Sequence, residues 1–403
     1  YGNYFAGETF QDMELDARHM IYGVGMWKIG GGDPWGDPNR GHLVPQAVET
    51  RDFARFADRN LDRGMLYTPL ALVVDYWGGW THRFASWRHK PLRWGDDEIT
   101  EIMLTFFPVA GRNPIGFGYE VANKDMADTP YGECFDVIKP NPPSGITPQK
   151  QLDGYKVLWL AGSWREVPPL LNRRLQSFVR KGGTLVVNAA HITGSPLSRP
   201  GETFDFDSAF AGVRFTGEVK VAKEAIMTLD DEKQPPFRSE AFRYAVLQEG
   251  EASVIGRTPT GEPLLTLNKV GKGHVILSAA WHNLTDQRSH ILPAIERLIT
   301  FISHQAQPVE VKGRIRYLVT RRDDGWVVAL LNNKGIFKSS QSDPEIDHHA
   351  RQTVDLVLRA KSRQVSEWTQ PYTNWPFQIK EDRTHCGITV PAGDVRVLFF
   401  KTK

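Results

Sequence analysis

The residues best suited to chemistry gather in a glycine-rich loop near the start of the sequence. Indole rings cover the apolar C–H face of a pyranose, and amide, guanidinium and imidazole groups bond its hydroxyls. The predicted substrate-binding residues are Trp27, Lys28, Trp35, Asp37, Asn39, Arg40 and His42. The alternative is a loop that its tryptophans only make rigid. We expect no metal there, because no second His or Cys stands near His42 at ligand spacing.

A second candidate patch follows a continuous apolar run. Residues 70–75 are typical of a buried parallel strand, and open α/β sheets bind ligands beyond the carboxyl ends of such strands. The patch consists of Asp75, Tyr76, Trp77 and Trp80. The patch could bind carbohydrate or pack against another domain or subunit. We favour packing, because the two glycines between Trp77 and Trp80 suit a tight turn.

An amidase or protease is another possible class, and it requires a catalytic cysteine in a recognisable position. Such enzymes place a cysteine on a strained strand-to-helix turn and activate it with a histidine. After the apolar run that ends at Ala161, the chain continues Gly162-Ser163-Trp164, without the cysteine and without a glycine beyond Ser163. Cys134 lies outside any such turn. An amidase or protease is therefore the less favoured class.

Secondary-structure elements must hold the candidate loop in place, and residues 1–62 contain only some of the elements of a complete domain. Residues 12–23 and 45–61 have helical apolar spacing, and residues 26–29 are expected to form a short strand between them. This is too little apolar surface for an independent core. It predicts the closing segment of a (β/α)₈ barrel, with the loop on the face where such barrels place their sites.

Residues 63–305 are predicted to form an α/β domain around a parallel sheet. Apolar runs at 70–75, 156–161, 184–188 and 274–279 predict its strands, and helical spacing at 167–181 and 291–304 predicts two helices. Residues 200–270 alternate in short runs and predict an antiparallel excursion. Residues 306–403 change to short strands separated by turn signals, which indicates a small antiparallel β-sandwich.

Composition excludes several classes of function. The 403 residues carry a net charge of +2 with scattered basic residues, so no nucleic-acid partner is expected. No apolar stretch is long enough to cross a membrane, no signal peptide is visible at the first residues, and the compartment is left open. The two cysteines, Cys134 and Cys386, are expected to be buried thiols rather than a disulfide. No cofactor is expected.

Four stretches, taken in order, resemble the C-terminal part of family 42 β-galactosidases. They are Arg18–Ile29, Leu66–Trp80, Leu175–Val187 and Val270–Leu277. In that family a glycosidase barrel is followed by a trimerisation domain similar to class I glutamine amidotransferases, and then by a small β-domain. The resemblance implies a flavodoxin-like middle domain, a homo-oligomer (a trimer in that family) and a carbohydrate substrate.

The resemblance also implies where the catalytic residues lie. Glycoside hydrolysis requires two carboxyl groups that flank the scissile bond. In such barrels they follow the fourth and seventh strands, and residues 26–29 resemble the eighth, so both are expected upstream of Tyr1. Glu8 is a weak candidate, since an acidic residue there suits the start of the following helix. The other hypothesis is a noncatalytic module for carbohydrate binding or oligomerisation.

Overall fold

The computed structural model describes residues 55–56, 58–76, 98–99, 101–102, 105, 132, 135–199, 203–206, 208–230, 232–286, 290–313, 315–332, 334–339, 342–369 and 373–403. These residues fall into two compact units. The first contains the described residues up to Tyr67, residue 132 and residues from Gln307 onward. The second contains the described residues of Thr68–Phe106 and Phe135–Ala306. The predicted barrel tail, residues 1–62, lies almost wholly outside the described residues.

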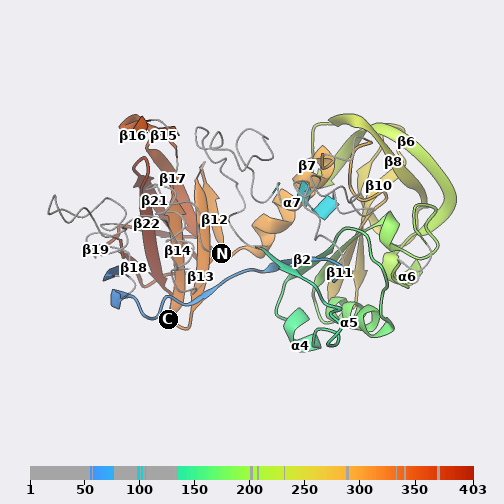
Figure 1. Cartoon of the computed structure of the whole chain (residues 1–403), viewed down its shortest axis with the longest axis horizontal. Coiled ribbons are helices and arrows are strands. Elements are labelled where there is room, and N and C mark those ends of the chain that lie inside the picture. The colour runs from blue at the N-terminus through green and yellow to red at the C-terminus, as the bar shows by residue number, and fades with distance from the viewer. Residues whose placement is uncertain are drawn as a thin grey trace. The chain divides into compact units, whose positions relative to one another are not determined.

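The second unit is built on one ten-stranded mixed sheet (Figure 1). Its parallel half has the spatial order β3-β2-β4-β5-β11. These strands are β2 (Leu70–Val73), β3 (Phe135–Ile138), β4 (Val157–Leu160), β5 (Thr184–Asn188) and β11 (Gly273–Ser278). In chain order this is the 2-1-3-4-5 arrangement of doubly wound sheets, whose direction of winding changes between β2 and β4.

Helix α5 (Pro169–Arg180) shows why the sequence folds this way locally. Proline at its first position needs no hydrogen-bond partner there. The helix buries four apolar residues at helical spacing, Leu171, Leu175, Phe178 and Val179. Gly183 follows the helix and lies so close to the Phe178 ring that a side chain would overlap it. The chain can therefore turn directly into β5.

The antiparallel half of the sheet adds the long strands of the second unit. These strands are β6 (Arg214–Leu229), β7 (Glu232–Lys233), β8 (Phe237–Gln248), β9 (Ser253–Arg257) and β10 (Pro263–Val270). Strand β10 pairs with β11, which joins the two halves, and β8 pairs with β6. The remaining helical segments are α4 (Gln149–Leu152), η3 (Ala189–His191), α6 (Ser208–Ala211) and α7 (Pro293–Ala306).

The first unit contains two larger antiparallel sheets that share a core. The six-stranded sheet has the order β1-β13-β14-β22-β18-β19, the four-stranded sheet the order β12-β17-β21-β20, and β15 pairs with β16. The strands are β1 (Met65–Leu66), β12 (Val309–Lys312), β13 (Arg316–Arg322), β14 (Gly325–Leu331), β15 (Ile336–Ser339), β16 (Ser342–Ile346), β17 (Gln352–Leu358), β18 (Gln364–Glu367), β19 (Thr373–Asn374), β20 (Gln378–Lys380), β21 (Arg383–Val390) and β22 (Val395–Lys401), with η4 at His348–Ala350.

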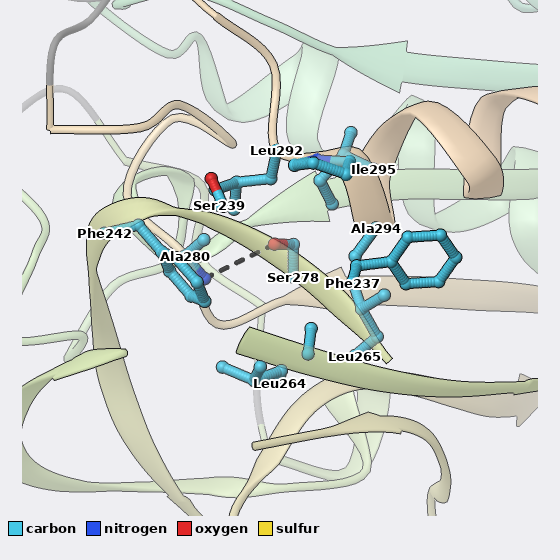
Figure 2. A pocket seen from close by; sticks show the side chains of 12 residues that line it. Phe237, Ser239, Phe242, Leu264, Leu265, Ser278, Ala280, Leu292, Ala294 and Ile295 are labelled. Atoms are coloured by element: carbon cyan, nitrogen blue, oxygen red, sulfur yellow. Dashed lines mark hydrogen bonds between the residues drawn. The ribbon is translucent and has the colours of Figure 1, made fainter. Parts of the chain in front are cut away.

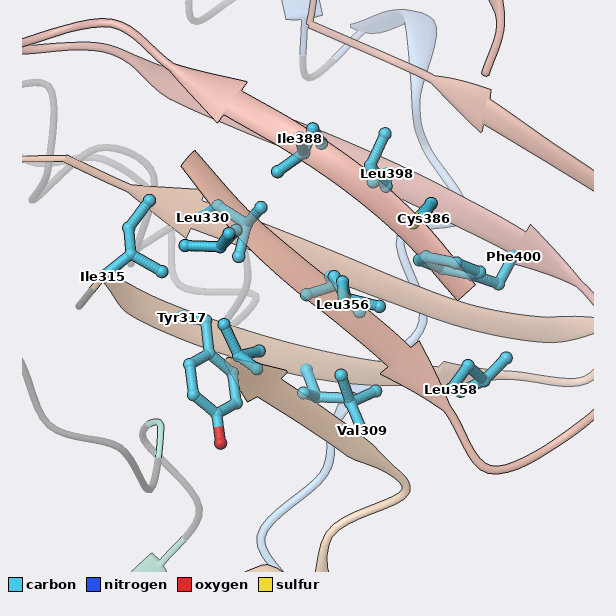
Figure 3. Packing of buried hydrophobic residues seen from close by; sticks show 14 of the residues in the cluster. Val309, Ile315, Tyr317, Leu330, Leu356, Leu358, Cys386, Ile388, Leu398 and Phe400 are labelled. Atoms are coloured by element: carbon cyan, nitrogen blue, oxygen red, sulfur yellow. The ribbon is translucent and has the colours of Figure 1, made fainter. Parts of the chain in front are cut away.

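Alternate residues of both sheets form the core of this unit (Figure 3). Leu356 on β17 and Cys386 on β21 come from one sheet, and Leu330 on β14 and Phe400 on β22 come from the other. The period of two along each strand places these side chains on the inner face. Cys386 is buried and reduced, as the sequence predicts; Cys134 lies outside the described residues.

The predicted strands and helices between residue 156 and the C-terminus are present within a few residues of their expected bounds. The expected antiparallel excursion is also present, as β6 to β10. The described residues form mixed and antiparallel sheets with few helices. Among the described residues, no helix combines the length and apolar character needed to cross a bilayer.

Candidate functional site

The described part of the second predicted patch lies at the carboxyl end of β2. The Asp75 side chain is fully buried, and its two oxygens accept hydrogen bonds from Asn141 Nδ2 (2.7 Å) and the backbone N–H of Arg165 (2.9 Å). Asn141 also accepts a hydrogen bond from the backbone N–H of Tyr76 (2.9 Å). Asp75 thus ties together the segments that follow β2, β3 and β4.

The other predicted site residues lie outside the part of the chain that the structure describes. Trp77 and Trp80 of the same patch lie outside the described residues. So do Glu8 and the whole predicted sugar-binding set, which consists of Trp27, Lys28, Trp35, Asp37, Asn39, Arg40 and His42.

A different cluster lies at the carboxyl ends of β4, β5 and β11, with the Glu98 carboxylate at its centre. Glu98 is fully buried. Its Oε1 accepts hydrogen bonds from Asn188 Nδ2 (3.0 Å) and Asn283 Nδ2 (2.8 Å), and its Oε2 accepts one from the backbone N–H of Gly162 (2.8 Å). A carboxylate so far from water requires such donors, because burial without them is very costly.

Gly162 connects the two sides of this cluster. Its φ of +70° lies in the left-handed region, which glycine adopts at little cost. In this conformation its N–H donates to Glu98, while its carbonyl accepts a hydrogen bond from His191 Nε2 (2.7 Å). The turn after β4 therefore holds both a carboxylate and an imidazole.

His191 is a neutral imidazole whose tautomer is set by Gly162. A carbonyl oxygen can only accept, so Nε2 carries the proton and Nδ1 carries a lone pair. His191 Nδ1 is buried and has no hydrogen-bond partner among the described residues. Burial lowers the pKa of His191 to about 4, although the nearby Glu98 carboxylate opposes that shift. The ring stays uncharged at neutral pH.

His282 and Asn283 complete the cluster from the end of β11. Both are non-glycine residues with left-handed backbones, at φ values of 44° and 52°. Two consecutive residues in that region are strained and need surroundings that fix them. With these backbone conformations, His282 Nδ1 lies 3.5 Å from Glu98 Oε2, and the Asn283 side-chain amide donates a hydrogen bond to Glu98. The rings of His282 and His191 meet edge to face at 5.8 Å.

The arrangement brings together one carboxylate and two imidazoles as possible ligands. One potential ligand atom from each of Glu98, His191 and His282 lies within 4.8 Å of the other two. In the described part of the chain no other group of three or more His, Cys, Asp or Glu side chains meets this criterion. Ser163, which stands after β4 where a nucleophilic cysteine would be expected in an amidase, is 1% exposed and so is shielded from a substrate.

Sequence reasoning missed this cluster, although a signal was present. Asp75 and Ser163 lie at the carboxyl ends of predicted strands, and the same rule applies to His191 after β5 and to His282 after β11. Both histidines come shortly after the end of a predicted parallel strand. Glu98 had no such signal, because it comes from a segment far away in the chain.

A small apolar hollow in the second unit is a packing gap. It measures about 20 Å³ and is lined almost entirely by apolar side chains, among them Phe237, Phe242, Leu265 and Ile295 (Figure 2). Ligand pockets usually measure about 300–1,000 Å³. This gap is therefore too small for a substrate.

A larger hollow lies on the four-stranded sheet of the first unit. Its volume is about 490 Å³, within the range of ligand pockets. Its lining combines charged, amide and aromatic side chains, including Lys312, Asp355, Phe377, Gln378 and His385. These residue types can bond hydroxyl groups and cover an apolar face.

Comparisons with known proteins give a likeness of fold. No family model and no curated protein matches the sequence. Among solved structures, the α-L-fucosidase isoenzyme 2 from Paenibacillus thiaminolyticus aligns with 100% of this chain and 60% of its own, at 12% identity and a TM-score of 0.57. A β-galactosidase from Rahnella sp. R3 aligns with 98% of this chain and 52% of its own, at 12% identity and a TM-score of 0.53.

Gan42B, a GH42 β-galactosidase, aligns with 98% of this chain and 51% of its own, at 13% identity and a TM-score of 0.51. The chain thus spans about half the length of the β-galactosidases that it resembles. At the level of the fold, the resemblance to family 42 β-galactosidases predicted from the sequence is confirmed.

Proposed function

We propose that this chain is the C-terminal, noncatalytic part of a glycoside hydrolase that acts on β-linked galactosides or related polysaccharide fragments. One observation carries the proposal. Both compact units, in their order along one chain, align with about half of a GH42 β-galactosidase and with 60% of an α-L-fucosidase. A single sheet or sandwich has many unrelated relatives, whereas an alignment that covers both units of one chain is more selective.

Under this proposal the two hydrolytic carboxyl groups belong to barrel strands upstream of Tyr1. The residues from Trp27 to His42 would form one wall of the sugar pocket at the barrel's carboxyl face. The flavodoxin-like second unit would mediate self-association, and the resemblance implies a trimer. The antiparallel sheets of the first unit would form the C-terminal β-sandwich. Asp75 would then have the packing role favoured above.

The experiment is to read the gene upstream of the codon for Tyr1. The proposal expects about 250 residues of repeated β-strand and helix, with glutamates at two strand ends. A longer protein expressed from that gene should hydrolyse an aryl β-galactoside, and replacement of either glutamate by glutamine should abolish turnover. A start codon close to Tyr1 would contradict the proposal.

A second candidate is a carbohydrate-binding module, and the 490 Å³ hollow of the first unit favours it. Asp355 and His385 would bond sugar hydroxyls, and Phe377 would cover a ring face. Titration of galactose or a galactan fragment, followed by NMR shifts, tests this function. Shifts confined to the hollow, and lost in Asp355→Ala, would support it; an unchanged spectrum would reject it.

A further inference from the structure

We propose that Glu98, His191 and His282 bind one divalent transition-metal ion, and that Zn²⁺ fits this donor set best. The inference does not depend on the glycoside hydrolase proposal, since it concerns side chains within the second unit alone. One carboxylate and two imidazoles form a ligand set that zinc uses in proteins with a fourth position open.

The His191 ring offers its lone pair to the cluster. Its Nε2–H is committed to the Gly162 carbonyl, so Nδ1 is the atom able to bind a cation. That nitrogen is fully enclosed and has no hydrogen-bond donor facing it among the described residues. An orphaned acceptor in a core calls for a partner, and a metal ion supplies one.

The spacing of the donors approaches that of a zinc centre. Tetrahedral zinc with bonds of about 2.1 Å separates its ligand atoms by about 3.4 Å. Nδ1 of His282 and Oε2 of Glu98 are 3.5 Å apart, and each of the three residues has a potential ligand atom within 4.8 Å of one from each of the other two. A bound ion would draw the three side chains together to the tetrahedral separation.

The surroundings resemble the outer shell of a metal site. Ligating histidines usually donate their second nitrogen to a carbonyl or carboxylate, and ligating carboxylates accept further hydrogen bonds. His191 donates to Gly162, and Glu98 accepts from Gly162, Asn188 and Asn283. The remaining oxygen of Asn283, Oδ1, is buried without a hydrogen-bond partner and is a candidate for the fourth position.

Charge and strain favour the same conclusion. A divalent ion would compensate the buried carboxylate of Glu98, whose hydrogen-bond donors among the described residues are three uncharged N–H groups. The left-handed backbones of His282 and Asn283 cost energy. That cost is compensated if both residues are held toward a bound cation.

The test uses the full chain after exhaustive dialysis against a chelator. Zn²⁺ binding is followed by calorimetry, with elemental analysis after reloading, and Co²⁺ is added separately to record visible absorption. We expect one Zn²⁺ per chain, a higher Tm on reloading and the intense visible bands of four-coordinate Co²⁺. A folded chain that binds neither ion above the level of a buffer control would overturn the proposal in favour of a network held by hydrogen bonds alone.

His191→Gln is the sharpest variant, because the glutamine amide can still donate to Gly162 while Nδ1 is removed. It should lower Zn²⁺ affinity at least about tenfold and retain the far-ultraviolet spectrum of the wild type. His274→Gln, on β11 outside the cluster, is the matched control and should bind Zn²⁺ like the wild type. Equal binding by all three proteins would place the ion elsewhere and contradict the assignment. If His191→Gln does not fold, the wild-type Co²⁺ spectrum decides.

Discussion

At the scale of single residues, the hydrogen bonds of Asp75 separate a packing role from a binding role. Both of its oxygens accept from donors on neighbouring loops. The same type of residue on an exposed surface would contribute little. Polar residues at the carboxyl ends of parallel strands can therefore hold neighbouring loops together as well as bind ligands.

Asp75→Asn should destabilise the chain by about 1–3 kcal/mol, since its amide group would face a buried donor. Chemical denaturation monitored by circular dichroism measures this. Asp153→Asn is the matched control: Asp153 pairs with Lys181 at 2.6 Å on the surface, and exposed pairs contribute about 0–1 kcal/mol. An Asp75→Asn chain as stable as the control would disprove the structural role of the carboxylate.

The Cys386 thiol makes stability depend on alkaline pH. Burial raises its pKa from 9.0 to about 12, and the charge of Asp355 adds to the shift. Above pH 9 the unfolded chain loses this proton while the folded chain keeps it, so the unfolded state binds fewer protons. Stability should therefore fall as pH rises from 9 toward 12, by up to about 1.4 kcal/mol per pH unit from this group.

Urea midpoints of wild type and Cys386→Ala, compared between pH 8 and pH 10.5, isolate this contribution. The wild type should lose more stability over that range than the variant. Parallel losses in both proteins would show that the thiol does not contribute.

Residue types and their spacing in the sequence predicted only some of the features described above. The reduced, buried state of Cys386 followed from its distance along the chain from Cys134. The cluster around Glu98 did not follow, because Glu98 and Asn283 are 185 residues apart in sequence. Only the three-dimensional fold brings them together, and apolar runs do not specify where the segment of Glu98 packs.

At the scale of elements, hydrophobic period predicted most of the strands and helices. Continuous apolar runs indicated β2, β4, β5 and β11, and helical spacing indicated α5 and α7. Strands β1, β3, β12, β15, β16 and β18 to β20 were missed. They are two to five residues long, which is too short to show a clear period of two.

Strands β14 and β22 of the first unit approach each other closely at Gly325, and this close packing can be tested by substitution. A side chain at Gly325 on β14 would overlap the carbonyl oxygen of Phe400 on β22. Gly325→Ala should therefore cost about 1–3 kcal/mol by forcing these strands apart. In Gly387→Ala on β21, the nearest atom is Asp355 Oδ1 at 3.7 Å, so the change should stay within about 0.5 kcal/mol. Thermal unfolding of both variants distinguishes them, and equal Tm values would refute the close packing of β14 on β22.

At the scale of the whole molecule, self-association is the expected property of the second unit. Sedimentation equilibrium of the full chain should show a concentration-dependent oligomer. Charge substitutions on exposed residues of the second unit should weaken the oligomer more than equivalent substitutions in the first unit. A strictly monomeric chain at high concentration would remove the oligomerisation role from the account.

The most direct measurement is the rate at which the purified 403-residue chain hydrolyses an aryl β-galactoside. If the catalytic carboxyl groups lie outside this chain, the rate will equal that of buffer alone, and Glu8→Gln will change nothing. Turnover that scales with protein concentration and disappears in Glu8→Gln would contradict the claim that this chain is the noncatalytic part of a glycoside hydrolase.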